Sequence, residues 1–230
     1  MNNGLSIIEL IIAMALSLSI LSIVIINVSQ SSSLSKKVIT NQQRLESIFH
    51  TVDTIKSDLT KCGMRLQEAR KTFNLKVFEN SSDHFMVLYG VSSEFLELDS
   101  VKGEKTIEII KNEYFKKKKK LLIYNLENDI YEYNEIKSTE NGKIILSKCL
   151  ENDYPVNSIV ILLKQVEYKL YPKQNILKRK VDKGYFQPLI EEVTDFYLNF
   201  FQDSKSVLYK IEINNKEQIR GYIFLVNMVA

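Results

Sequence analysis

The chain has 230 residues, of which 45% are hydrophobic and 26% charged, the composition of a globular protein. Its formal net charge of +3 is too small to indicate a nucleic-acid-binding protein. Only seven glycines are present, and the sequence contains no HExxH, no GxSxG and no glycine-rich phosphate loop, so none of these enzyme classes is indicated.

The first informative segment is an apolar run near the N-terminus. Between residues 5 and 28 the only ionisable side chain is Glu9. A helix of this length spans about 36 Å, more than the roughly 30 Å hydrocarbon core of a bilayer. The alternative is a secretory signal peptide, but its small-residue cleavage site should follow the apolar stretch, and the only such tripeptide, at 13–15, lies inside it. Residues 5–28 are therefore predicted to form one membrane-spanning helix.

Residues 29–63 are predicted to continue this helix as an amphipathic segment. The polar stretch 29–35 contains neither glycine nor proline. After it, apolar residues recur at steps of three and four, which places them on one helix face: Leu45, Ile48, Val52, Ile55, Leu59 and Cys62. This face either packs on the core of its own domain or forms a seam against other subunits. Gly63 follows as a C-cap, so the helix is expected to end there.

Beyond residue 63 the hydrophobic pattern becomes that of strands. Short runs rich in β-branched and aromatic residues alternate with polar or turn-forming breaks. The predicted strands cover residues 85–89, 106–110, 121–124, 130–133, 143–146, 158–163, 166–171, 176–180, 196–201, 209–213 and 221–228. Residues 187–193 fit either a short helix or an extended bridge.

The expected fold class is α+β. A long N-terminal helix, transmembrane and then amphipathic, should pack on an antiparallel β domain formed by residues 64–230. The domain is expected to contain two sheets, at about 64–150 and 151–230.

The N-terminal residues carry a family resemblance. Gly4 directly precedes the apolar helix, and Glu9 lies five positions after it. This arrangement resembles the leader of type IV pilins and type II secretion pseudopilins, with Leu5 in place of the usual phenylalanine. The resemblance implies that residues 1–4 are a leader, that a prepilin peptidase cleaves after Gly4, and that the new terminal amine of Leu5 is methylated. It also implies an assembly role for Glu9, since the amine of a neighbouring subunit could compensate its buried charge.

Later segments resemble one branch of this superfamily. Residues 55–64 are similar to the end of the N-terminal helix in PilW-type minor pilins and J-type pseudopilins, where an acidic residue and a leucine precede a glycine. The C-terminal pattern is similar to the second sheet of those proteins, in which a strand ending in tyrosine precedes a Leu-x-Arg strand and a later aromatic strand. The segments that carry this pattern are 166–170, 177–179, 188–193 and 196–200. A pilin-like fold is therefore expected.

The function implied by this resemblance is that of a minor pilin or pseudopilin that primes or caps a type IV filament. Its expected partners are the prepilin peptidase, other minor and major pilins, the membrane and, through the platform protein, the assembly ATPase. The chain should cross the cytoplasmic membrane once, with its N-terminus in the cytoplasm and its C-terminal domain outside. It would lie at the tip or base of a surface filament.

The one conspicuous charge run comprises Lys116, Lys117, Lys118, Lys119 and Lys120. Because like charges repel, this run is predicted to be a solvated hairpin tip. Alternatively it contacts an anionic cell-wall polymer, lipid head groups or DNA, and the last would suit a competence pseudopilin that assists DNA uptake.

The remaining reactive side chains offer little chemistry. Cys62 and Cys149 either form a disulfide or stay as buried thiols, and no histidine or cysteine lies at metal-ligand spacing. His50, His84 and the pair Glu191-Glu192 are expected to be surface or hydrogen-bonded residues rather than catalytic ones. No metal or cofactor is expected, and a membrane-anchored extracytoplasmic enzyme or binding domain is the least favoured alternative.

Overall fold

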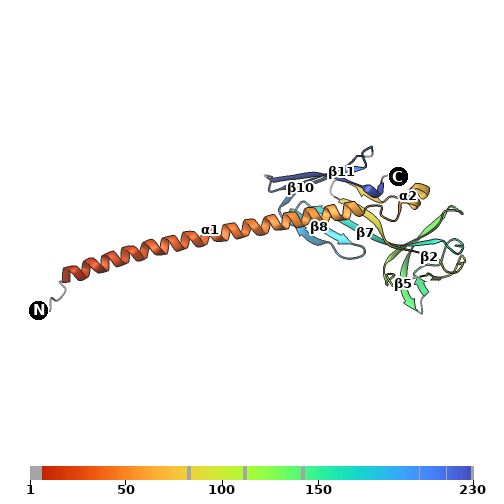
Figure 1. Ribbon diagram of the computed structural model, residues 1–230, viewed down its shortest axis with the longest axis horizontal. Helices are drawn as coiled ribbons and strands as arrows, with labels where there is room; N and C mark the ends of the chain where they lie inside the picture. The colour runs from red at the N-terminus through yellow and green to blue at the C-terminus, as the bar shows by residue number, and fades with distance from the viewer. Residues whose placement is uncertain are drawn as a thin grey trace. The chain divides into compact units, whose positions relative to one another are not determined.

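The computed structural model of the chain describes residues 7–81, 84–110, 113–140, 143–201, 203–215 and 217–228 (Figure 1). The chain divides into two units, Met1–His50 and Thr51–Ala230. The described part of the first unit is entirely helical. The second unit contains the last turns of the same helix, one further short helix and all the described strands.

Helix α1 runs without interruption from Ile7 to Lys61 (Figure 1). The hydroxyls of Ser17, Ser19 and Ser22 donate hydrogen bonds to carbonyl oxygens one turn earlier, at 2.8 to 2.9 Å. These bonds satisfy the hydroxyls inside an otherwise apolar stretch. The serine-rich segment 29–35 is helical as well, in keeping with its lack of glycine and proline.

The helix ends where the backbone of Gly63 turns to the left-handed region, with a φ of +71°. The Gly63 N–H donates to the carbonyl oxygen of Leu88 at 3.0 Å, which ties the helix end to strand β2 (His84–Phe95). A Cβ at this position would lie 3.3 Å from the carbonyl oxygen of Asn227. Both the positive φ and this close approach favour glycine, so the helix ends where the sequence predicts.

A second helix, α2, spans Gln67–Phe73 and is not predicted by the sequence analysis. It ends at Asn74, whose φ is +51°, and only Ala69 is buried along it. Phe73 packs against Tyr131 and Tyr124, with ring centroids 4.7 and 6.1 Å apart. Seven residues with one buried side chain show too little periodicity to be recognised as a helix.

The described strands form two antiparallel sheets. The first contains β1 (Phe78–Asn80), β2 (His84–Phe95), β3 (Thr106–Glu108), β4 (Lys120–Asn125), β5 (Ile130–Glu140), β6 (Lys143–Leu146), β7 (Ile159–Tyr171), β8 (Ile176–Val181) and β9 (Gln187–Ile190). The second contains β10 (Val193–Phe201), β11 (Ser206–Ile213) and β12 (Glu217–Phe224), and the 3-10 turn Val226–Met228 follows it. A long apolar N-terminal helix and a C-terminal antiparallel β domain confirm the α+β class.

The first sheet branches at β7. Its main path is β1-β2-β7-β4-β5-β6-β3, and β8 and β9 extend from β7 on the side of β4. One edge of β7 pairs with β2, while the other pairs with β4 at residues 159–162 and with β8 at residues 166–171. The sequence predicts two strands here, but Lys164 and Gln165 continue the ladder with β2, so β7 is a single strand.

Two apolar cores follow from this branching. One is enclosed by β4, β5, β6 and the neighbouring strands, and its buried members include Leu96, Ile107, Phe115, Ile136, Tyr154 and Val160. The other surrounds the last turns of α1, where Val52, Ile55, Leu59 and Cys62 are buried. In this second region Phe85 stacks on Tyr168 with centroids 4.4 Å apart, and Phe196 of β10 lies 5.5 Å from Phe85.

Two features of the packing differ from expectation. Leu45, the first residue of the predicted apolar face, is 52% exposed and lies in the first unit. The second sheet begins at Val193 rather than near residue 151, because β7, β8 and β9 follow one another as antiparallel neighbours and extend the first sheet. Residues 187–193 are extended, with a turn at Glu192, whose φ is +63°.

Replacing Leu59 by alanine tests the buried face of α1. Leu59 is fully buried, so truncation should leave a cavity and lower the free energy of unfolding by about 2–5 kcal/mol. Leu45→Ala removes the same atoms from an exposed position and should change the free energy of unfolding by less than about 0.5 kcal/mol. Urea unfolding of the full chain in detergent micelles, followed by circular dichroism, measures both, and equal losses would contradict this assignment.

Candidate functional site

Among the described residues, one helix, α1, is long and apolar enough to cross a membrane. Every large aliphatic side chain from Ile7 to Val28 is more than 50% exposed, and none of this apolar segment is buried. A core helix of a soluble domain would bury such side chains. The segment therefore has the properties of a membrane anchor or a signal sequence.

Glu9 is the acidic residue in the first turn of α1. A carboxylate at this position interacts favourably with the partial positive charge of a helix N-terminus. Exposed aliphatic side chains, including Ile8 and Ile12, flank it along the helix, so in lipid its charge would be costly without a positive partner. Gly4 and Leu5, the predicted cleavage and methylation residues, lie outside the described residues.

A buried polar junction joins the end of α1 to the first sheet. Asp58 of α1 is 3% exposed, and its Oδ2 accepts a hydrogen bond from the Tyr168 hydroxyl of β7 at 2.5 Å. The same oxygen accepts a bond from Nε of Arg179 of β8 at 2.9 Å and lies 2.8 Å from its Nη2. Three elements thus converge on one carboxylate oxygen.

The environment of the junction keeps its donors protonated. Burial, reinforced by the charge of Asp58, raises the pKa of Tyr168 far above its ordinary value. Burial acts to lower the pKa of Arg179, but the hydrogen bonds and charges of Asp58 and Tyr168 outweigh it and raise that pKa. Because a buried ion pair is stable only when both partners are present, we regard this triad as the attachment point of the helix.

The segments that hold these residues are recognisable in the sequence, but the contact between them is not. Asp58, Tyr168 and Arg179 lie in three segments that carry the family resemblance. A signal for the junction is present in the sequence, since Asp58 lies beside Ile55 and Cys62 on the helix, at spacings of three and four, and a charge next to an apolar face requires a partner. The identity of the basic residue that pairs with Asp58 depends on which strands lie side by side, and no local sequence pattern shows this.

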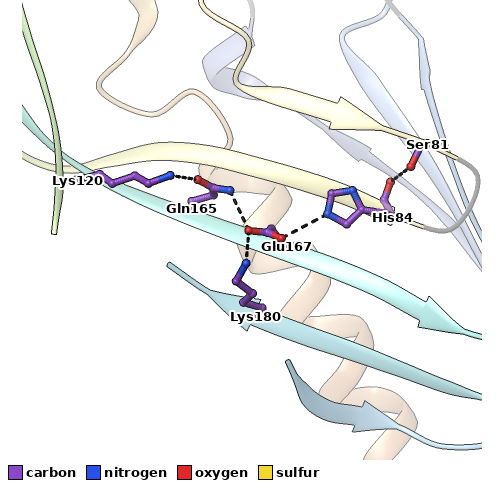
Figure 2. A network of polar contacts seen from close by, with 6 residues as sticks. All are labelled: Ser81, His84, Lys120, Gln165, Glu167 and Lys180. Atoms are coloured by element: carbon purple, nitrogen blue, oxygen red, sulfur yellow. Dashed lines mark hydrogen bonds and ion pairs between the residues drawn. The ribbon is translucent and has the colours of Figure 1, made fainter. Parts of the chain in front are cut away.

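A second polar network follows the other face of the sheet, because neighbouring residues of β7 point to opposite faces (Figure 2). Oε1 of Glu167 accepts a hydrogen bond from Gln165 Nε2 and pairs with Lys180 Nζ, both at 2.9 Å, and Oε2 lies 3.6 Å from His84 Nε2. Lys120 donates to Gln165 Oε1 at 2.7 Å. The His84 ring is partly exposed and faces Glu167, and the Ser81 hydroxyl donates to the His84 carbonyl oxygen at 3.0 Å (Figure 2), which agrees with the interpretation of His84 as a surface or hydrogen-bonded residue.

The five lysines do not form a hairpin tip. The Lys118 N–H donates to the carbonyl oxygen of Ile136 at 2.8 Å, and the Ile136 N–H donates to the carbonyl oxygen of Lys119 at 2.9 Å. The run therefore lies beside β5 and leads into β4. Lys119 also pairs with Asp182 at 2.6 Å, and the last lysine belongs to the network of Figure 2. Residues 116–118 and Lys120 are exposed, as the charge run predicts, and Lys119 is half-buried.

The two cysteines are free thiols in the structure, Cys62 buried and Cys149 exposed. Cys62 Sγ donates to the carbonyl oxygen of Val77 at 3.3 Å, and burial raises the pKa of this thiol to about 12. Of the two alternatives, the disulfide is not formed, and the buried-thiol alternative holds for Cys62 alone.

The other predicted surface residues are exposed. His50, Glu191 and Glu192 all face solvent, and Glu192 accepts a hydrogen bond from Asn214 Nδ2 at 2.7 Å. Within the part of the chain that the structure describes, no three His, Cys, Asp or Glu side chains are grouped to hold a metal ion.

Comparisons with known proteins give no family. Neither a scan against protein-family models nor a search of the curated proteins returns a match. The chain is similar to the Gp54 tailspike of Acinetobacter baumannii bacteriophage AP22, solved in complex with A. baumannii capsular saccharide, at 14% identity and a TM-score of 0.29, over 34% of this chain and 15% of that one. It is similar to the phage phi92 endosialidase at 5% identity and a TM-score of 0.20, over 58% of this chain and 29% of that one. The chain spans less than a third of either protein, and similarity this low carries no inference.

Removing the charge of Asp58 tests the junction. Asp58→Asn leaves the half-buried Arg179 without its anionic partner, so the free energy of unfolding should fall by about 3 kcal/mol. Asp53→Asn makes the same change at an exposed position of the same helix and should cost less than about 0.5 kcal/mol. Denaturant unfolding of the full chain in detergent measures both variants. A small loss for Asp58→Asn would show that the ion pair does not hold the helix.

Alkaline pH should weaken the junction through Tyr168. Tyrosine in the unfolded chain titrates near pH 10, and the pKa of Tyr168 in the folded chain is higher. The contribution of Tyr168 to the free energy of unfolding is therefore complete below about pH 10. Above that pH the contribution is lost, by up to about 1.4 kcal/mol per pH unit. Between about pH 10 and 12, the free energy of unfolding should fall less steeply with pH in Tyr168→Phe than in the wild type. Tyr114→Phe, at an exposed position, should keep the wild-type slope.

Proposed function

We propose that this chain is a minor pilin or pseudopilin, of the PilW or J type, that primes or caps a type IV filament after a prepilin peptidase removes its leader. One observation carries the proposal: in the sequence the Gly4-Leu5 bond opens an apolar stretch in which Glu9 is the only charged side chain before residue 36, and from Ile7 on the aliphatic side chains of that stretch are exposed. This combination supplies a cleavable bond, a membrane anchor and a carboxylate within the apolar segment.

The assembly role of Glu9 follows from electrostatics. Cleavage after Gly4 would leave the amine of Leu5 as a positive charge at the start of the helix. A carboxylate is costly within lipid or between packed helices unless a cation offsets it. The amine of a neighbouring protomer could do so, and only one axial register of two helices brings that amine and Glu9 together. The pair would therefore set the stagger between successive subunits.

The structure of the second unit supports a priming or capping subunit. Its helix turns are held to β7 and β8 by the buried Asp58 junction and by the apolar residues around Leu59. A β domain attached in this way would follow the helix when the helix is extracted from the membrane. Such a domain, with two sheets, suits the end of a filament better than its repeating wall, an argument that rests on family analogy.

In this proposal the chain crosses the cytoplasmic membrane once, with its N-terminus inside and the β domain outside. The prepilin peptidase and the other minor and major pilins would contact it directly, while the assembly ATPase would act through the platform protein. DNA contact is not included, because the lysine run does not form a free tip: the backbone groups of Lys118 and Lys119 bond to Ile136, and the Lys119 side chain is paired with Asp182.

The mature N-terminus tests the proposal. Intact-mass and peptide mass spectrometry of the chain from native membranes should show a wild-type protein that begins at a methylated Leu5. Gly4→Leu should block cleavage, because the peptidase is expected to require glycine at this position, and should leave a precursor that begins at Met1.

Glu9→Ala is the matched control, since it alters the helix but leaves the scissile bond intact. This variant should be processed like the wild type yet enter filaments poorly, as measured by its amount in sheared filament fractions. A wild-type chain that begins at Met1, or a normally trimmed Gly4→Leu chain, would refute the proposal.

A further inference from the structure

A groove of about 590 Å³ opens on the face of the first sheet that carries the network of Figure 2. Leu88 of β2 and Leu163 of β7 contribute an apolar floor. Residues 74–76, which follow α2, and Glu79 of β1 also line the groove, as do residues of β5. The volume is within the range of about 300–1,000 Å³ that is typical of sites for small ligands or short chain segments.

The charged residues at the groove leave an excess of positive charge. Those that line it are Lys76, Lys120, Lys148, Lys183, Glu79 and Glu135. Lys183 pairs with Glu135, and Lys120 is bonded to the neutral amide oxygen of Gln165, as Figure 2 shows. Lys76 and Lys148 form no ion pair within the described part of the chain. Four lysines against two glutamates leave an excess of two positive charges at the groove, which would attract an anionic ligand.

Neutral hydroxyls and aromatic rings line the groove beside these lysines. Tyr131 and Tyr133 of β5 are 40% and 46% exposed, and their rings meet edge to face with centroids 6.1 Å apart. Burial, followed by the proximity of Tyr131, raises the pKa of Tyr133, so its hydroxyl remains a neutral donor and acceptor. The Ser147 hydroxyl and the Asn74 amide add groups of the same kind. A sugar, with apolar C–H faces and many hydroxyls, is complementary to such a surface.

Side chains at the edge of β5 beside the groove hold the loop that contains Lys148 and Glu151. At the edge of β5, the Asn134 Oδ1 accepts a bond from the Lys148 N–H at 3.2 Å, and the Glu132 Oε2 accepts one from the Glu151 N–H at 2.8 Å. An extended peptide draws its affinity mainly from main-chain bonds at an open edge, so a peptide is not favoured.

We propose that this groove binds a segment of an acidic polysaccharide, with Lys76, Lys120 and Lys148 contacting its carboxylates and Tyr131 and Tyr133 contacting its sugar rings. The proposal rests on the second unit alone. It does not depend on leader cleavage or filament assembly, so either proposal can fail without the other.

Binding of defined polymers to the full chain in detergent micelles tests the site. Polygalacturonate, which carries one carboxylate per sugar, should bind, and added salt should weaken the binding. Neutral dextran and a single-stranded oligothymidylate should not. The triple variant Lys76→Gln/Lys120→Gln/Lys148→Gln should lower the affinity for polygalacturonate at least about tenfold.

A matched control separates the groove from general positive charge. Lys116→Gln/Lys117→Gln/Lys118→Gln removes the same charge from exposed positions that do not line the groove, and should change affinity less than about twofold. Tyr133→Ala leaves the charge unaltered and should still reduce binding at least about fivefold. Thermal unfolding midpoints equal to that of the wild type establish that each variant is folded.

The outcomes that would overturn the proposal are distinct. Equal losses in the two triple variants would show diffuse electrostatic attraction. Unchanged affinity in Tyr133→Ala would remove the sugar contact. Tighter binding of the oligothymidylate, abolished by the groove variant, would make this a nucleic-acid site, and no binding of polygalacturonate to the folded wild type would leave no site for this ligand.

Discussion

The carboxylate of Asp58 is the point on which the arrangement of the second unit depends. It is 3% exposed and receives hydrogen bonds from Tyr168 and Arg179, which lie on adjacent strands. A charge withdrawn this far from water is tolerated only while its partners remain, so the helix and both strands must keep their relative register. Successive side chains of β7 point to opposite faces of the sheet. Glu167, which precedes Tyr168, therefore lies on the opposite face and bonds Gln165 and Lys180 there, beside the groove.

Helix α1 places two acids in very different surroundings. Asp58 finds its cation, Arg179, within its own chain. Glu9 lies at the other end, among exposed aliphatic side chains. In the proposed function that second acid finds its cation on another subunit, so one helix would use the same electrostatic requirement twice, once to fix a domain and once to fix an assembly. The uninterrupted helix from Ile7 to Lys61 keeps both acids on one regular element.

Features set by local periodicity could be predicted from the sequence. The end of α1 at Gly63 and the strand at 143–146 both follow from short-range patterns, glycine after an apolar face and a β-branched run between polar breaks. Features set by distant pairing could not. Lys164 and Gln165 look like a break between strands, yet β2 supplies partners that make β7 continuous.

The candidate sites show the same division. The apolar helix with Glu9 is evident in the sequence, whereas the Asp58 triad needs β7 and β8 to be adjacent, and the groove needs β5 and the 74–79 segment to be adjacent. The predicted hairpin tip at the lysine run is wrong for a related reason. Repulsion between like charges favours a free tip, but Ile136 of β5 forms backbone hydrogen bonds with Lys118 and Lys119. A run of like charges indicates solvated side chains, but the position of the run in the fold depends on which strand it pairs with.

The most direct test of the central claim is a double-mutant cycle on the buried ion pair, with Asp58→Asn, Arg179→Gln and both together, measured as free energies of unfolding of the full chain. The account predicts that the double variant loses less than the sum of the single losses, with a coupling energy of about 2–3 kcal/mol. Losses that add to within about 0.5 kcal/mol would contradict it, because the two side chains would then contribute independently.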